Sequence, residues 1–410
     1  MDKQTFLQSV TNCIRTKEAK ILVEKELNSH LQKSEQDWKS KGLTESEAEQ
    51  KAVAEMGNPV TLGKKFHAMY KPKFDWITAS VFIVVLLVGS IPLFLLQEVV
   101  TYISISSKVT SLGIGIFIAA FIMFSTYQKW VKYRFPLYIG STSFLIVAFI
   151  FQYFELYGGI FQYRDARIHL GGSGIDLSIT IPFLLVAFAG LLAKPLSKHW
   201  TLIVLLSVPN LLLLTLIDYA TALAFVLMTI TMLAFNQHKK TAVAISYIFG
   251  VILVPSLFFR FGTLWWGGSI IPGTSWIPKM VPLKYDLYIS HGMAIHTTMV
   301  GRLLMYSLGY FLTGLLLVSL VYFLLKAISL VKVIQNKMGQ QLLIGSAVLF
   351  GFQLFYNVGM NVGVLPFMSV PLPFLSYGLL PILLNAIFIG IILSTYRTKN
   401  IQMSTTNKIG

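Results

Sequence analysis

The sequence predicts an all-α polytopic membrane protein with about ten transmembrane helices, preceded by a small soluble helical domain. Hydrophobic residues make up 55% of the 410 residues and charged residues only 12%, and the mean hydropathy is +0.69. Such a composition lies far from that of soluble globular proteins. Residues 1–74 nevertheless hold ten of the 17 acidic residues and 13 of the 33 Lys and Arg residues. This contrast places a soluble segment before a membrane domain.

Most of the net charge of +16 belongs to the membrane part, because residues 75–410 keep 20 Lys and Arg residues but only seven acidic ones. In membrane proteins such an excess anchors cytoplasmic loops. Nucleic-acid binding would need a basic patch typical of nucleic-acid-binding domains, and none is evident, so we expect no nucleic-acid partner. The single cysteine, Cys13, excludes a disulfide framework and a cysteine-based metal site.

Residues 1–72 form the expected soluble domain, which we place in the cytoplasm. Helical patterns cover residues 19–39 and 60–70. The first of these helices should bury one apolar side, made of Ile21, Leu22, Leu27 and Leu31.

Between those two helices, the stretch GLTESEAEQKAVAEMGNP predicts a third. Thr44 and Glu47 have the spacing of a capping box, in which each side chain bonds the other residue's backbone N–H. Gly57 followed by Pro59 then marks the end of this helix and the start of the next.

The membrane domain is expected over residues 75–400, with a cytoplasmic tail at 400–410. Apolar windows long enough to cross a bilayer can be recognised by their length and their charged boundaries. Ten such windows lie at about 75–97, 108–127, 135–154, 176–194, 200–217, 219–236, 241–259, 299–326, 341–364 and 378–396.

Basic clusters decide the expected orientation. They fall on every second loop, at Lys71 and Lys73, Lys129 to Arg134, Lys194 and Lys198, Lys239 and Lys240, Lys326 to Lys337, and Arg397 and Lys399. The positive-inside rule then places both termini in the cytoplasm. Two loops on the opposite side are long, at about 155–175 and 260–298, and we expect function there and in the cavity beneath them.

Two features within the membrane domain point to a site. Residues 357–378 contain glycines and prolines that cannot continue a lipid-facing helix, so they form either a cavity-lining re-entrant loop or an ordinary Pro-rich turn. Asp218 lies between the fifth and sixth spans with only apolar neighbours in sequence. It is either a functional ionisable group or an N-cap of the sixth span.

Three blocks resemble the SEDS family (FtsW, RodA and SpoVE; shape, elongation, division and sporulation proteins). The most specific is NVGMNVGVLPFMSVPLPFLSYG at 357–378, which Gln353 and Asn385 flank at the family's spacing. VPNLLLLTLIDYATALAF at 208–225 and RIHLGGSGIDLSITIP at 167–182 are supporting matches. In the last block, the family's Glu and Lys fall on Ile179 and Pro182. The resemblance covers about residues 75–400.

The soluble domain resembles the permease-prefix (HAAS-like) domain through GLTESEAEQKAVAEMGNPVTLGKKF and the pattern E-L-x-x-H-L from Glu26 to Leu31. This resemblance implies a cytoplasmic regulatory or docking module. A helical solubilising cap is the alternative.

The SEDS resemblance implies a protein of the bacterial cell membrane that polymerises peptidoglycan glycan strands. The substrate would be lipid II, an undecaprenyl-pyrophosphate-linked precursor, and the partner a class B penicillin-binding protein. Polymerisation needs a base for the acceptor hydroxyl and positive charge for the departing pyrophosphate. A divalent metal is compatible with that chemistry, and the resemblance does not identify one.

The resemblance puts the family's catalytic aspartate in HTTMVGRLLMYSLGYF at 296–311, where this chain has Thr298. A threonine hydroxyl is not a base at neutral pH, so the base is either missing or displaced. Asp286 is one replacement, with a loop residue paired to Lys284 as the alternative. His296 is another, with an interfacial anchor as the alternative.

Arg302 would face a cavity and bind the pyrophosphate, or else pair with Asp218 or another acid. The resemblance implies further substrate-binding residues at Asp218, Arg167, Asn357, Pro373, Ser376 and Tyr377. Two main functions therefore stay open: an active glycosyltransferase, and an impaired paralogue that binds lipid II or partners and regulates wall synthesis. A transporter should show two related halves with broken helices, and no such repeat is evident.

Overall fold

The computed structural model comprises two compact units, Met1–Phe74 with Tyr396–Gly410, and Asp75–Thr395. We call the first the head and the second the membrane unit. The residues described are 1–91, 105–157, 167–170, 173–193, 200–235, 246, 250, 300–362, 364–365, 368, 370–376 and 378–403.

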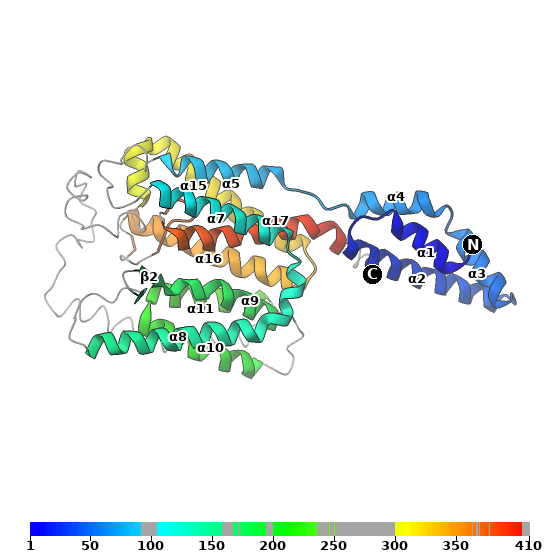
Figure 1. Ribbon diagram of the computed structural model, residues 1–410, viewed down its shortest axis with the longest axis horizontal. Helices are drawn as coiled ribbons and strands as arrows, with labels where there is room; N and C mark the ends of the chain where they lie inside the picture. Colours follow the sequence, from blue (N-terminus) through cyan, green and yellow to red (C-terminus); the bar gives the residue numbers. More distant parts are fainter. Residues whose placement is uncertain are drawn as a thin grey trace. The chain divides into compact units, whose positions relative to one another are not determined.

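The head is a four-helix unit (Figure 1). Its helices are α1 (Lys3–Asn12), α2 (Lys17–Ser40), α3 (Glu45–Glu55) and α4 (Pro59–Tyr70). Their buried side chains form one core, which includes Phe6, Val10, Val23, Leu27, Leu31 and Tyr70.

Local sequence signals determine the helix boundaries in the head. The capping box is present: Glu47 N–H donates to Thr44 Oγ1 at 3.4 Å, and Thr44 N–H donates to Glu47 Oε2 at 3.1 Å. Asn58 caps α4 through the N–H groups of Val60 and Thr61. The expectation for Ile21 is wrong, since this side chain is 60% exposed. The inward stripe of α2 instead repeats every four residues, at Ala19, Val23, Leu27 and Leu31.

Helices dominate the membrane unit, which confirms the predicted fold class (Figure 1). They are α5 (Trp76–Val88), α7 (Ile105–Phe124), α8 (Arg134–Tyr157), α9 (Thr180–Leu192), α10 (Trp200–Ile217), α11 (Tyr219–Phe235), α15 (Val300–Val333), α16 (Lys337–Val362) and α17 (Leu379–Met403). Nine predicted spans overlap these helices, and the tenth, 241–259, lies outside the described residues except for 246 and 250. Among the described residues, four helices are long and apolar enough to cross a membrane and five shorter ones are apolar.

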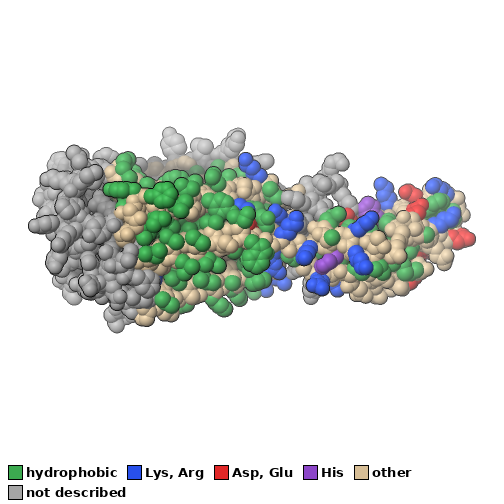
Figure 2. All heavy atoms as spheres, turned by 90° about the horizontal axis from the view of Figure 1, so that it is seen from above, with side chains coloured by type: hydrophobic (Ala, Val, Ile, Leu, Met, Phe, Trp, Pro, Cys, Tyr) green, Lys and Arg blue, Asp and Glu red, His purple; other side chains and the backbone are tan. Residues whose placement is uncertain are grey.

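Figure 2 shows hydrophobic side chains gathered over the membrane unit. Several of the predicted basic loops meet at one end of its helices. Gly339 packs directly against Tyr127, and Gly190 packs against Arg134. Ser394 Oγ donates to the carbonyl of Ser125 at 3.3 Å. The basic segments around 129–134 and 337 therefore lie on the same side of the bundle.

An ion pair joins two helices of the membrane unit. Asp75 caps α5 by accepting from Thr78 N–H at 3.2 Å and Thr78 Oγ1 at 2.9 Å. The same carboxylate, 5% exposed, pairs with Lys326 Nζ of α15 at 2.8 Å. Because the carboxylate is buried and hydrogen-bonded, this pair fixes the start of α5 against α15.

A two-stranded antiparallel hairpin precedes α9, a small addition to the predicted all-α fold. It consists of β1 (Arg167–Leu170) and β2 (Ser173–Asp176), with Arg167 opposite Asp176. The single 3₁₀ turn η2 (Leu177–Ile179) connects β2 to α9.

Candidate functional site

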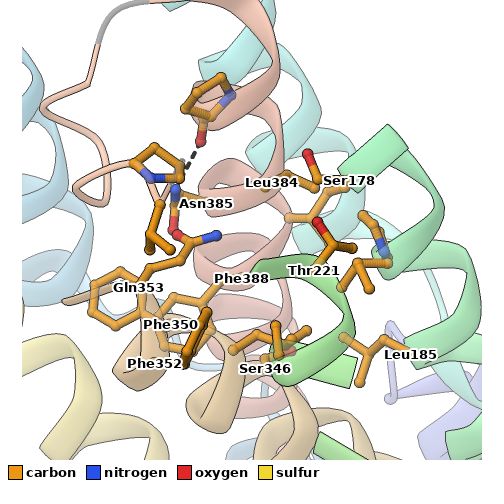
Figure 3. A pocket seen from close by; sticks show the side chains of 18 of the residues that line it. Ser178, Leu185, Thr221, Ser346, Phe350, Phe352, Gln353, Leu384, Asn385 and Phe388 are labelled. Carbon is orange, nitrogen blue, oxygen red and sulfur yellow. Dashed lines mark hydrogen bonds between the residues drawn. The ribbon is translucent and has the colours of Figure 1, made fainter. Parts of the chain in front are cut away.

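An open pocket with about 900 Å³ of empty space lies between α9, α11, α16 and α17 (Figure 3). Its polar lining comes from four separate segments and consists of Ser178, Asp218, Thr221, Ser346, Gln353 and Asn385. Its apolar wall includes Leu185, Phe350, Phe352 and Phe388, and residues Val370 and Pro371 close one side.

Asp218 is an N-cap, one of the two roles that the sequence left as alternatives, and its functional role stays a prediction. Its carboxylate accepts hydrogen bonds from the N–H groups of Ala220 and Thr221, both at 3.2 Å, and from the Thr221 hydroxyl. These contacts make it the N-cap of α11. Asp218 also lines the pocket, so the cap holds a carboxylate at the pocket wall.

Helix α16 presents two polar side chains to the pocket, Ser346 and Gln353, two turns apart (Figure 3). The Ser346 hydroxyl and the Gln353 Oε1 atom are buried, and within the described part of the chain neither has a hydrogen-bond partner. A buried polar atom without a partner costs about 1–3 kcal/mol. A ligand that supplies hydrogen-bonding groups would remove this cost.

Asn385 lines the pocket from α17, with its side chain only 2% exposed. Its Nδ2 donates to the carbonyl of Pro381 at 2.7 Å, the contact dashed in Figure 3. One turn further along, Phe388 stacks on Phe350 with 4.5 Å between ring centroids. The stacked pair gives the pocket an aromatic floor that joins α16 to α17.

Within the Pro-rich segment after α16, residues 372–376 form a buried loop, which favours the re-entrant reading of 357–378 over an ordinary turn. Leu372, Phe374 and Leu375 are at most 1% exposed. Phe374 packs edge-on to Phe82 of α5 with 5.2 Å between centroids, and it also contacts rings on α15 and α16. Its φ of 61° is rare for a bulky residue, so the surrounding packing must hold this conformation.

Three predicted substrate-binding residues lie within or beneath this loop. Asn357 is fully buried and donates from Nδ2 to the carbonyl of Val370 at 2.7 Å. Ser376 is fully buried, and its Oγ accepts from Leu372 N–H at 2.6 Å. Pro373 is buried between them in sequence. The contacts of Asn357 and Ser376 shape the loop, whose residues Val370 and Pro371 then reach the pocket wall.

The sequence analysis did not single out Lys108 as a site residue, although α7 carries it into the membrane unit with 4% exposure. Its Nζ donates to the carbonyl of Ser376 at 3.4 Å. A charged group so deeply buried is costly unless it is well bonded. Lys108 of α7 thus also holds the Pro-rich loop in place, in addition to the hydrogen bonds of Asn357 and Ser376.

The predicted catalytic residues Asp286, His296 and Thr298 lie outside the described residues, as does Tyr377. Arg302 falls in the first turn of α15, and Arg167 begins β1. Helix α15 breaks at Gly309, where φ is 75°, a conformation that favours glycine. Residues 300–308, which include Arg302, therefore form a separate helical piece before the break.

Among the described residues, the pocket has a single carboxylate, Asp218, and no three His, Cys, Asp or Glu side chains come together anywhere in that part of the chain. The described pocket lining therefore offers no metal donor set.

Of the residues named in the family blocks, Asp218, Thr221, Ser178, Gln353 and Asn385 converge on the pocket although their blocks are far apart in sequence. Ser346 was missed, since a serine within an apolar span has no distinguishing signal. The aromatic wall was missed as well, because Phe residues in spans more often face lipid or helix neighbours.

Known proteins share these features. The profile of the FtsW/RodA/SpoVE family, described as a cell cycle protein family, matches residues 294–401. A probable peptidoglycan glycosyltransferase FtsW from Geobacter sulfurreducens is 25% identical over 315 residues, covering 69% of this chain and 82% of the relative. Another, from Nitrosomonas europaea, is 32% identical over 137 residues, covering 32% of this chain. That alignment spans only 31% of the Nitrosomonas protein's length.

Two solved structures share the fold. A chain from a peptidoglycan synthase complex has a TM-score of 0.59 at 19% identity, covering 80% of this chain and 98% of its own. The rod shape determining protein RodA of Thermus thermophilus has a TM-score of 0.56 at 19% identity, covering 79% and 97%. These matches show that residues 294–401 resemble the FtsW/RodA/SpoVE family in sequence and that the membrane unit shares the fold of RodA.

Proposed function

We propose that this protein binds lipid II in the described pocket and acts in peptidoglycan glycan-strand synthesis. The observation that carries the proposal is the convergence on one pocket of Asp218, from the block at 208–225, with Gln353 and Asn385, which flank the block at 357–378. Relatives named as probable peptidoglycan glycosyltransferases support the same reaction class. The bacterial membrane is the expected location, with both termini in the cytoplasm.

The pocket chemistry suits a sugar or peptide more than a free ion. Hydroxyl and amide groups at Ser346, Gln353 and Asn385 are groups that hydrogen-bond to neutral polar ligands. Among the described residues, the side-chain oxygens of Ser346 and Gln353 have no hydrogen-bond partner, so a ligand could form hydrogen bonds with them. The neighbouring Phe350 and Phe388 rings provide apolar surface against which a ring face can pack.

Roles outside the pocket follow from the sequence. Arg302 and Arg167 are the proposed cations for the pyrophosphate, because a leaving group with that charge needs guanidinium or ammonium partners. Asp286 or His296 would then take the proton of the attacking sugar hydroxyl. By resemblance, a class B penicillin-binding protein would cross-link the product, and one structural relative comes from a synthase complex.

Polymerisation of labelled lipid II by the purified full-length protein, with and without its penicillin-binding partner, tests this assignment. If the protein is an active enzyme, the wild type makes glycan polymer. Asp286→Ala or His296→Ala then lowers the rate of polymerisation about 10²- to 10⁴-fold if the altered residue is the base. Matched controls are Lys279→Ala and His291→Ala, which remove a polar residue from the same 260–298 stretch. Equal loss in the controls would indicate general damage to the loop.

A second function is favoured by two departures from the family pattern. Thr298 occupies the position of the family's catalytic aspartate, and Pro182, which lines the pocket, occupies the position of a family lysine. Loss of a base and of a pocket cation would leave a protein that binds lipid II and regulates its use. Under this alternative, wild type makes no polymer with its partner present and Thr298→Asp restores synthesis. Polymer from wild type that Asp286→Ala abolishes would exclude the impaired form.

A further inference from the structure

Helix α4 has one side that packs against the head core and an opposite side that is exposed. Gly63 and Tyr70 are buried, and Leu62 and Phe66 pack against the head core. Gly63 is so close to α1 that an added Cβ would lie 2.7 Å from the Val10 carbonyl oxygen. This packing fixes the rotation of α4 about its own axis.

The opposite side of α4 is exposed, and we call it the α4 basic face. It consists of Val60, Thr61, Lys64, Lys65, Ala68 and Met69. Two exposed lysines follow α4 directly, Lys71 and Lys73. The face therefore combines positive charge with exposed apolar side chains, of which Val60 is 47% and Met69 56% exposed.

Negative charge is missing from this stretch of sequence. No Asp or Glu occurs between residues 56 and 74, whereas α2 and α3 together carry nine of the head's ten acidic residues. The basic face thus has no acidic neighbour within its own segment. A run of four lysines in ten residues without compensating charge attracts anions.

The short linker between α4 and the membrane unit limits which partners the α4 basic face can contact. Only residues 71–75 separate the end of α4 at Tyr70 from the start of α5 at Trp76, the first apolar helix of the membrane unit. Five residues reach at most about 18 Å when fully extended. Trp76 is 74% exposed and is of the type that anchors helices at the bilayer interface. The lysines of α4 are thereby tethered close to a membrane surface.

We propose that the α4 basic face binds the anionic phospholipid headgroups of the membrane in which the chain is anchored. Clusters of four or more lysines beside a membrane helix bind anionic lipids, and exposed apolar residues strengthen such contacts. The tether favours lipid over an acidic protein, because it holds anionic headgroups near the face at all times. The head would then dock on the bilayer in a manner that depends on lipid charge and salt. This inference is independent of the proposed reaction.

The test uses the full-length protein in lipid nanodiscs, with a spin label on the exposed face at Ala68→Cys. Cys13→Ser removes the native thiol and keeps its hydrogen bond to the Ser9 carbonyl. In phosphatidylglycerol-containing nanodiscs we expect an immobilised label, and in phosphatidylcholine nanodiscs or at high salt a mobile one. Each lysine near an anionic surface raises the ratio of membrane-bound to free head by a factor of roughly five. Lys64→Glu with Lys65→Glu therefore lowers this ratio at least about 25-fold.

The matched control is Lys25→Glu with Lys33→Glu, which reverses two exposed lysines on α2. We expect this variant to keep the lipid-dependent immobilisation. Circular dichroism checks that both double variants keep their helix content. The proposal is overturned if the label has the same mobility in anionic and neutral nanodiscs, or if the control reduces binding as much as the Lys64 and Lys65 variant.

Discussion

Asp218 provides the sharpest way to separate structure from function in the pocket. Its carboxylate both caps α11 and lines the pocket, so replacing it tests two roles at once. Asp218→Asn keeps an oxygen that can accept the two backbone N–H groups, and Asn is as good an N-cap as Asp. Asp218→Ala removes the cap entirely.

The structure allows the two costs to be compared. Loss of an N-cap costs about 0.5–2 kcal/mol. Asp218→Ala also leaves the hydroxyl of Thr221, a residue only 5% exposed, without its acceptor, which adds up to about 1–3 kcal/mol. We therefore expect Asp218→Ala to be destabilised by about 1–5 kcal/mol and Asp218→Asn to stay near wild type.

Binding should respond differently. A hydrogen bond to a charged group contributes about 1.5–3 kcal/mol, against about 1 kcal/mol for a neutral one. If the ligand bonds to the carboxylate, Asp218→Asn weakens lipid II binding about tenfold, since about 1.4 kcal/mol corresponds to a factor of ten. Stability is measured by thermal unfolding in detergent and affinity by titration of labelled lipid II in nanodiscs.

The result that would refute this reasoning is a fully functional Asp218→Asn protein. Wild-type affinity and polymerisation in that variant would mean that Asp218 acts only as a helix cap. Equal destabilisation by Asn and Ala would contradict the cap geometry itself.

Three further predictions concern stability of the fold. Lys326→Met leaves the buried Asp75 carboxylate without its ion-pair partner and should cost about 3 kcal/mol, seen as a lower unfolding midpoint in detergent that Lys326→Arg largely restores. Gly345→Ala should destabilise by about 1–3 kcal/mol, because its Cβ would overlap Leu185, whereas Gly314→Ala meets open space and should be neutral or stabilising in the same assay. Thr44→Ala removes the capping box and should cost about 1 kcal/mol, seen as faster amide hydrogen exchange at the start of α3.

Local features of the fold could be predicted where the signal is short in sequence. The capping box at Thr44 and Glu47 depends on residues only three positions apart. Ile21 was wrongly predicted to be buried because the apolar residues of α2 are compatible with more than one choice of the helix face that packs inward. Only packing against α1 and α3 selects the stripe of Val23, Leu27 and Leu31.

Some of the residues that line the pocket could be predicted from the sequence. The SEDS-like blocks marked Asp218, Gln353 and Asn385 without stating that they meet. Their convergence depends on how α11, α16 and α17 pack, which no single block encodes. The roles of Asn357 and Ser376 illustrate the same limit, because a family motif does not distinguish a residue that contacts a ligand from one that holds the loop behind it.

The Pro-rich loop shows how physical reasoning added to the motif. Proline and glycine at membrane depth require surroundings other than lipid, which predicted a buried or cavity-lining segment. The structure places Phe374 at the centre of three aromatic contacts. Lys108 could not be foreseen as a partner of this loop, since 268 residues separate it from Ser376.

Binding of labelled lipid II to the full-length protein in nanodiscs tests the central claim most directly, because both candidate functions require the pocket to hold this substrate. Wild type should bind saturably, and Gln353→Leu with Ser346→Ala should weaken binding about tenfold or more, since two ligand hydrogen bonds are lost. Gln340→Leu, on the same helix but outside the pocket lining, should keep wild-type affinity. Absence of saturable binding, or equal affinity in the pocket variant and wild type, would contradict the account.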